Sequence, residues 1–149
     1  MADNIPYVEK MIEVGDLEIG IRAEPFRFLQ GGLSENGEKK MVSRMIVSLK
    51  ANQKQVVAKF LEIFYRINVK IYDKNGNEIS DMPKRSYFPP DHFKEEILPP
   101  NKMRRLALLA YAKGNTNNFD FLNVEVSFTN NFNSWTHPFS LRVSVPVNH

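Results

Sequence analysis

Histidine and carboxylate side chains cluster at one place in this sequence, in the stretch DHFKEE that begins at Asp91. In a helix over residues 91–97, His92, Glu95 and Glu96 would share one face, because positions three and four apart lie side by side. An imidazole with two carboxylates suits a hard or borderline cation. The alternative is an exposed acidic loop in which Asp91 caps a short helical turn. No second histidine stands at ligand spacing, so we predict no metal cofactor.

Residue types used in covalent catalysis are scarce in the rest of the chain. The 149 residues include no cysteine, which excludes disulfides, thiolate nucleophiles and cysteine-ligated metal centres. The motifs of serine hydrolases, zinc peptidases, phosphate-binding loops and dinucleotide-binding folds are also missing. Carboxylates that only folding brings together cannot be recognised from sequence. These observations predict a protein that is not an enzyme and uses no cofactor.

Charge is unevenly distributed along the chain. Residues 1–38 contain eight acidic and three basic residues, whereas residues 39–59 contain six basic residues and no acidic one. Either the two segments face each other in the fold, or each contacts something outside it. We call the basic residues of the second segment the basic patch: Lys39, Lys40, Arg44, Lys50, Lys54 and Lys59.

The basic patch supports two interpretations. On an extended strand its cations would follow nucleic-acid phosphates, and Phe60, Phe64 and Tyr65 are near enough in sequence to stack on bases. However, these aromatic residues follow the lysines and do not alternate with them. Lysines that protect a sheet edge from pairing explain the same residues. A nucleic-acid-binding sheet is therefore only the third of our functional hypotheses.

Apolar residues alternate with polar ones over much of the chain, which is typical of half-buried β-strands. Six segments follow this period: 17–22, 41–50, 63–72, 103–112, 121–128 and 139–147. Residues 24–29 are a candidate seventh strand. The segment 103–112 is apolar on both faces after its arginines, which predicts a central strand covered on both sides. Together the segments predict an all-β fold, an antiparallel β-sandwich of about seven strands with one or two short helices.

Helix and turn signals separate the predicted strands. The spacing of apolar residues in 52–64 predicts a short helix, with one long strand entered through a bulge as the alternative. After the strand at 63–72, the Asn-Gly pair at 75–76 suits a chain reversal, because both residues accept positive φ. Residues 78–79 then begin a return strand or lead into a loop that crosses between sheets.

Length and composition predict one soluble domain that spans residues 1–149. Hydrophobic residues make up 42% and charged residues 25% of the chain, which is ordinary for a globular domain. Residues 1–14 are expected to form a flexible or helical N-terminal extension. We find no secretory leader, and no run of about 18 apolar residues predicts a membrane span. We therefore expect a cytoplasmic protein, unless a leader has been removed.

Four stretches in the middle of the chain follow one another in a characteristic order: VSLKANQ at 47–53, INVKIYDKNGNEI at 67–79, FPP at 88–90 and LPPNKMRRLALLA at 98–110. This order resembles the FxLYD-type β-sandwich modules of bacteria over about residues 45–111. Tyr72-Asp73 with Gly76 is similar to the strand-end motif of those modules. Residues 98–100 are similar to the leucine-proline-glycine approach to their next strand.

The resemblance implies an immunoglobulin-like fold and a role in interactions or envelope-associated structures, with no catalytic residues. The chain departs from these modules at several places. Pro100 and Asn101 stand where the modules usually have a glycine, Ser48 replaces a small strand glycine, and the basic patch is an addition. Such modules usually follow a leader or a membrane anchor, which we do not find in this sequence.

Loop aromatics suggest a second class of ligand. Trp135 and Phe132 lie in asparagine-rich loops. With Tyr111 and Phe119 they would offer flat faces for stacking on sugar rings, while side-chain amides bind the hydroxyls. A tryptophan just before the last strand is also typical of a partly buried plug. A carbohydrate-binding module is therefore the alternative functional hypothesis.

The leading hypothesis is a non-enzymatic protein-interaction or structural module, for example a subunit of a bacterial or phage-type assembly. Its partner would be another protein or a second copy of the chain, because sheet edges offer unpaired backbone groups to an added strand. Arg104 and Arg105 would anchor such a contact. The candidate interaction surface consists of Trp135, Phe132, Arg104 and Arg105.

Overall fold

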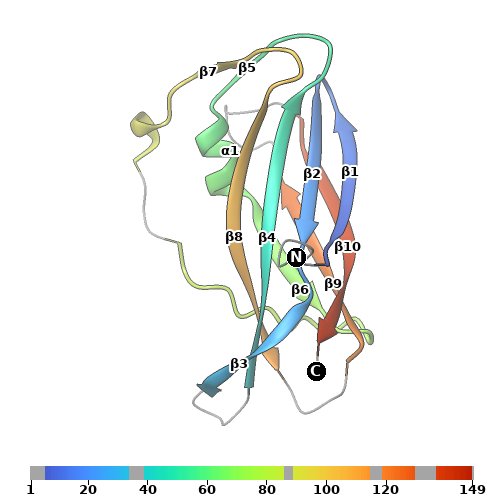
Figure 1. Ribbon diagram of the computed structural model, residues 1–149. Helices are drawn as coiled ribbons and strands as arrows, with labels where there is room; N and C mark the ends of the chain where they lie inside the picture. The colour runs from blue at the N-terminus through green and yellow to red at the C-terminus, as the bar shows by residue number, and fades with distance from the viewer. Residues whose placement is uncertain (1–5, 34–38, 86–88, 115–118, 130–136, 149) are drawn as a thin grey trace.

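The computed structural model describes residues 6–33, 39–85, 89–114, 119–129 and 137–148. Within these ranges the chain forms ten strands and one α-helix (Figure 1). The strands are β1 (Val8–Val14), β2 (Leu17–Ala23), β3 (Phe26–Leu33), β4 (Lys39–Ala51), β5 (Val56–Ala58), β6 (Asn68–Tyr72), β7 (Glu96–Leu98), β8 (Met103–Gly114), β9 (Phe121–Phe128) and β10 (Phe139–Asn148). The helix is α1 (Phe60–Arg66), and a short 3-10 helix, η1, covers Pro90–His92. The prediction of a β-rich fold with short helices is confirmed.

Eight strands are linked by backbone hydrogen bonds in the order β1-β2-β4-β3-β10-β9-β6, with β8 paired to the other edge of β4. Their pairings are antiparallel apart from that of β10 with β3, which run parallel. β5 and β7 form a separate antiparallel ribbon. The described strands outnumber the predicted seven, because β1 and this short ribbon were not expected.

The N-terminal segment forms a strand, not the flexible or helical extension expected for residues 1–14. β1 pairs with β2 across a tight turn in which Gly15 has a φ of 59°. A glycine with positive φ at the first turn position suits the hairpins that join antiparallel strands. Val8, Ile12 and Val14 then pack against the core from alternate positions. The expectation is therefore wrong for β1.

The segment predicted as a strand over 63–72 is divided between α1 and β6. Ile63 and Ile67 fit both the two-residue period of a strand and the spacing of a helix. Phe60 and Phe64 fit only the helical spacing, and both are buried. The short helix predicted before this segment is confirmed, but it begins at Phe60 and extends into the expected strand.

The chain reverses after β6 as predicted, around the side chain of Asp73. Oδ1 of Asp73 accepts hydrogen bonds from the backbone N–H groups of Asn75 (2.8 Å) and Asn77 (3.0 Å). Gly76 has a φ of 85°, which glycine adopts without strain. Residues 78–79 pair briefly with β6 before the chain passes to β8.

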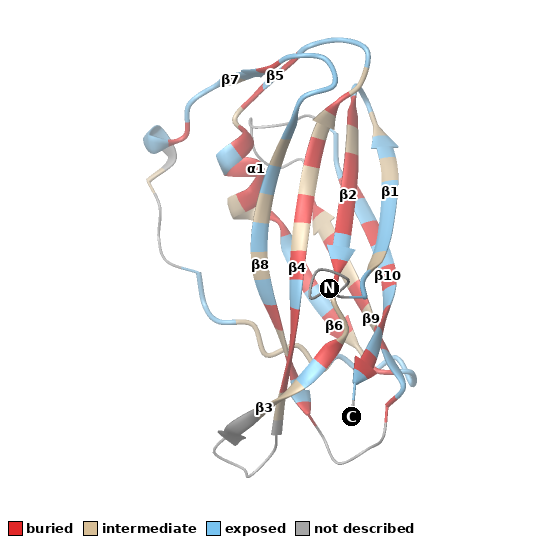
Figure 2. Cartoon of the chain, in the orientation of Figure 1, coloured by how far each residue is buried: buried red, intermediate tan, exposed pale blue. Residues whose placement is uncertain are grey.

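One cluster of buried apolar residues draws on β2, β4, β6, β9 and β10, with every second residue of β9 and β10 buried (Figure 2). β8 differs from these strands. From Met103 to Leu109 none of its residues is fully buried, and burial begins at Ala110. The prediction that 103–112 is a central strand covered on both sides is therefore wrong for the first half of β8. There β8 is an edge strand, paired with β4 alone.

Candidate functional site

The first half of β8 has an outer edge that forms no backbone pairing with any described residue. In an antiparallel pair, successive residues direct their N–H and C=O groups alternately toward and away from the partner strand. The N–H of Ala51 on β4 donates to the carbonyl of Lys102 (3.1 Å), so even-numbered residues of β8 face β4. The N–H and C=O groups of Arg105, Ala107 and Leu109 therefore point to the open edge.

The second half of the same edge is closed by the segment that follows the turn. The N–H of Lys113 donates to the carbonyl of Ile79 (2.8 Å), and the N–H of Asp81 donates to the carbonyl of Tyr111 (2.8 Å). These bonds define an antiparallel ladder with Ser80 opposite Ala112. In this ladder too, the N–H and C=O groups that point away from β4 belong to odd-numbered residues of β8. This agrees with the register between β4 and β8.

The ladder stops at a proline. In the same register, the next donor on this segment would be the N–H of residue 83, which would bond to the carbonyl of Leu109. Residue 83 is Pro83, which has no N–H. The N–H of Tyr111 donates to the sulfur of Met82 (3.4 Å), not to a backbone carbonyl. The edge of β8 therefore stays open from Leu109 back to Met103.

An apolar groove of about 800 Å³ lies beside this open edge. Its walls come from α1, the start of β6, residues 82–85 and residues 106–109 of β8. Leu106 and Leu108 line it from β8, and both are only partly buried. Phe93 lines it too and contacts the ring of Tyr65, with 5.6 Å between ring centroids. The volume and lining are typical of binding sites for apolar groups.

The rim of the groove is positively charged. Lys84 and Arg85 line it, and none of its described lining residues carries a carboxylate. Arg85 donates a hydrogen bond to the carbonyl oxygen of Tyr65. Desolvation lowers the pKa of the Arg85 guanidinium, and the nearby Tyr65 raises it by a smaller amount. On α1, the buried Glu62 forms an ion pair with Arg66 (3.4 Å).

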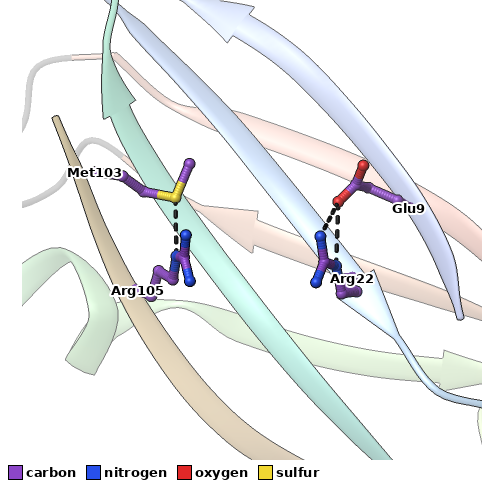
Figure 3. A network of polar contacts seen from close by, with 4 residues as sticks. All are labelled: Glu9, Arg22, Met103 and Arg105. Atoms are coloured by element: carbon purple, nitrogen blue, oxygen red, sulfur yellow. Dashed lines mark hydrogen bonds and ion pairs between the residues drawn. The ribbon is translucent and has the colours of Figure 1, made fainter. Parts of the chain in front are cut away.

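The two arginines predicted as contact residues lie on opposite faces of β8. Arg104 is on the inward face and forms an ion pair with Glu96 of β7. Arg105 is on the outward face and exposed, and its Nε donates to the sulfur of Met103 (3.0 Å; Figure 3). Arg105 thus lies at the open edge, while Arg104 connects β8 to the β5–β7 ribbon.

The outer face of the sheet is hollowed at Gly20. Gly20 pairs with Ser48 on β4, and a Cβ at position 20 would come within 2.7 Å of the Ser48 oxygen. Arg22 and Glu9 form an ion pair (3.2 Å) on one side of the hollow, and Arg105 lies on the other (Figure 3). At about 90 Å³ the hollow is far smaller than the groove. The groove is therefore the candidate site.

Part of the basic patch is neutralised by acidic neighbours. Lys40 forms an ion pair with Asp81 (3.1 Å), and Arg44 with Glu24 (4.0 Å). β2 also runs beside β4, and its one acidic residue, Glu18, pairs in register with Lys50. This arrangement favours the interpretation in which the acidic and basic segments face each other in the fold.

The other members of the basic patch are separated along the chain and the fold. Lys39 begins β4, and Lys50 near its far end pairs in register with Glu18. Lys54 lines a polar cavity of about 420 Å³, and Lys59 immediately precedes α1. These positions do not place the six residues in one continuous strip along a strand.

The helix that would align His92, Glu95 and Glu96 is not formed over residues 91–97. η1 ends at His92 and β7 begins at Glu96, because pairing with β5 holds this segment extended. Glu96 is also ion-paired with Arg104. Among the residues that the structure describes, no group of three or more histidine, aspartate or glutamate side chains could hold a metal ion. The helical arrangement that would bring His92, Glu95 and Glu96 together is therefore not observed.

Most of the aromatic residues considered for ligand stacking are buried or lie outside the described ranges. Phe60 and Phe64 belong to the core, so they present no face to bases. Phe119 is buried as well, which removes one member of the predicted sugar-binding set. Trp135 and Phe132 lie outside the described residues. The loop surface predicted for these two residues therefore lies outside the part of the chain that the structure describes.

No protein-family model matches this chain, and no curated protein is significantly similar to it. The groove and the open edge are therefore the features from which a function can be inferred. In the described part of the chain, no helix is long and apolar enough to cross a membrane.

The groove has no motif of its own in the sequence. Its rim residues Lys84 and Arg85 follow Pro83 in an ordinary polar stretch. The one available signal is the apolar character of both faces of residues 103–112, which is also typical of a buried central strand. An edge strand beside an unfilled groove has the same pattern, so alternation alone does not distinguish the two.

Proposed function

We propose that this protein is a non-enzymatic interaction module that binds an extended segment of a partner protein along the open edge of β8. One observation carries the proposal: the outward N–H and C=O groups of Arg105, Ala107 and Leu109 lie beside an apolar groove of about 800 Å³. An added strand would pair with these groups and place every second side chain in the groove. An adaptor or a subunit of a larger assembly works by such contacts.

The proposal includes an immunoglobulin-like β-sandwich as the fold of a single domain. One layer would consist of β1, β2, β4 and β8, and the other of β6, β9 and β10, with the shared apolar cluster between them. Asn101 supports the likeness to FxLYD-type modules. Its φ of 65° is the left-handed conformation, at a place where those modules usually have a glycine.

Selection from a random peptide library, followed by two proline variants, tests the proposed function. Ala107→Pro removes an N–H that points to the open edge and leaves the hydrogen bonds to β4 intact, because edge strands tolerate proline at such positions. Met11→Pro is the matched control, since Met11 is an outward-pointing residue of the other edge strand, β1. Thermal unfolding of both variants verifies that they are folded.

We expect the selected peptides to bind the wild-type protein and to lose at least about tenfold in affinity with Ala107→Pro, which corresponds to one or more lost hydrogen bonds. Met11→Pro should retain the wild-type affinity. The proposal fails if the library yields no binding peptide. It also fails if Ala107→Pro, when folded, binds the selected peptides as tightly as the wild-type protein does.

A further inference from the structure

We infer that the segment bound at β8 has apolar side chains at alternate positions and a carboxylate at the end that lies beside Lys84 and Arg85. The inference rests on the proposed function, because it specifies the chemistry of the partner segment. Three features of the described residues carry it: the direction of the side chains on β8, the apolar lining of the groove, and the uncompensated positive charge of its rim.

The alternation follows from the geometry of β8. Side chains on the same face of neighbouring strands lie side by side. Leu106 and Leu108 line the groove, so every second side chain of an added strand would enter the groove next to them. The lining comes mainly from leucine, phenylalanine, isoleucine, valine and methionine side chains. Apolar side chains are therefore preferred at these positions, because burial of a polar group without a partner is costly.

The position of the carboxylate follows from the register at Pro83. Pro83 is the residue that would face Leu109 if the ladder continued, and Lys84 and Arg85 come directly after it. The cations therefore lie near the Leu109 end of the open edge. A segment that occupies the edge brings one of its ends to this place, whichever direction it runs.

The positive charge of the groove rim indicates that the charged group of the partner segment is negative. The acceptor that Arg85 has among the described residues is the carbonyl of Tyr65, not a carboxylate. The acidic side chains of α1 and β7, Glu62 and Glu96, are already in ion pairs. A carboxylate from the partner would form charge-assisted hydrogen bonds with Arg85. A basic segment would meet like charges in a partly desolvated place, which opposes binding.

Two synthetic peptides test the inference. Both have a core in which leucine and threonine alternate, and they differ only in having glutamates or lysines at both ends, so that either strand direction is covered. Binding is measured by fluorescence anisotropy with the wild-type protein, with Ala107→Pro, and with the double variant Lys84→Glu, Arg85→Glu. Circular dichroism verifies that each variant is folded.

We expect the acidic peptide to bind the wild-type protein at least about tenfold more tightly than the basic one, since like-charge contacts in an interface oppose binding. The double variant should reverse this order. If both peptides bind equally and Ala107→Pro weakens both, the inference fails while the proposed function stands. If neither peptide binds, or Ala107→Pro changes nothing, the proposed function fails as well.

The wild-type protein and Ala107→Pro also test two other candidates for the groove and the open edge. These are an amphiphilic small molecule and a second copy of this chain. Calorimetry with sodium dodecanoate tests for an amphiphilic small molecule. If dodecanoate binds and neither peptide does, both the inference and the proposed function are overturned. Light scattering of the protein alone tests for a second copy. A concentration-dependent mass that Ala107→Pro abolishes would assign the edge to another copy of this chain and overturn the inference.

Discussion

β1 and β8 are both edge strands, but different side chains accompany their unpaired backbone groups. By the pairing with β2, the residues of β1 whose N–H and C=O groups point away from the sheet are Glu9, Met11 and Glu13. By the pairing with β4, the corresponding residues in the first half of β8 are Arg105, Ala107 and Leu109. Two of the three residues are acidic on β1, whereas two of the three are apolar on β8.

This difference indicates that an open edge is a binding site only where its side chains and surroundings permit one. Charged residues on an edge strand oppose the approach of another strand. Glu9 also forms an ion pair with Arg22, which an approaching strand would have to desolvate. On β8, Leu109 is 47% exposed, and the groove lies directly beside the strand. We infer that β1 is protected against pairing and that β8 is prepared for it.

Removal of the charges from β1 should have the largest effect. In Glu9→Val with Glu13→Val, the outward positions of β1 become apolar, and we expect a concentration-dependent shift from one copy to two or more in light scattering. Glu95→Val is the control, since it removes an exposed carboxylate that belongs to neither edge strand. An unchanged mass for the double variant would contradict the idea that charge protects this edge.

Loss of the Asp73 side chain should have the next largest effect. Asp73→Ala removes the acceptor of two backbone N–H groups in the turn that delivers residues 79–81 to β8. We expect a loss of about 2 kcal/mol in the free energy of unfolding, measured with urea, because the lost bonds involve a charged and buried acceptor. Asn75→Ala, at an exposed position of the same turn, is the control. Equal losses in the two variants would show that the carboxylate does not organise the turn.

A change in the β1–β2 turn should have a smaller effect that is confined to β1. Gly15→Ala forces a side chain into a positive-φ conformation, at a cost of about 1 kcal/mol. Amide exchange should become faster in β1 and stay unchanged in β8. Asp16→Ala, next to it in the turn, is expected to have less effect. Faster exchange in both edge strands would mean that the two edges are coupled and cannot be compared independently.

The smallest change in stability is expected for Pro83→Ala, which makes the first half of β8 more like its closed second half. The new N–H at position 83 can donate to the carbonyl of Leu109, a gain of about 1 kcal/mol that the greater freedom of the unfolded chain offsets. The N–H at position 83 should exchange slowly with solvent, and peptide binding at the edge should weaken. The N–H of Lys113, which already bonds to Ile79, is the internal control and should keep its exchange rate. Rapid exchange at position 83 would show that the proline does not terminate the ladder.

Local patterns predicted much of the fold because they depend on residues close together in the chain. The alternation in 121–128 and 139–147 corresponds to β9 and β10, and the Asn-Gly pair marks the turn after β6. The boundary between α1 and β6 was missed because Ile63 and Ile67 satisfy both periods, so packing decides between them. The antiparallel arrangement of the strands was predicted correctly.

The candidate site depends on pairings between distant parts of the chain, and these leave no local signal. β8 has an open edge because Pro83 occupies one particular position of a ladder that joins residues some thirty positions apart. Its apolar pattern over residues 103–112 is the same for a central strand and for an edge strand with a groove. The helix over 91–97 that would align His92 with the glutamates is not formed for a related reason, since pairing with β5 holds the end of this segment extended.

Amide hydrogen exchange along β8 tests the central claim most directly. The N–H groups of Leu106 and Leu108 bond to β4 and should exchange slowly, whereas those of Arg105, Ala107 and Leu109 point to the open edge and should exchange rapidly. Toward the end of the strand, Lys113 should be protected, since its N–H bonds to Ile79. We therefore predict that slow and rapid exchange alternate from Arg105 to Leu109. This alternation should end where residues 79–81 pair with β8. Uniformly slow exchange from Arg105 to Leu109 would show that the edge is already covered and would contradict the account.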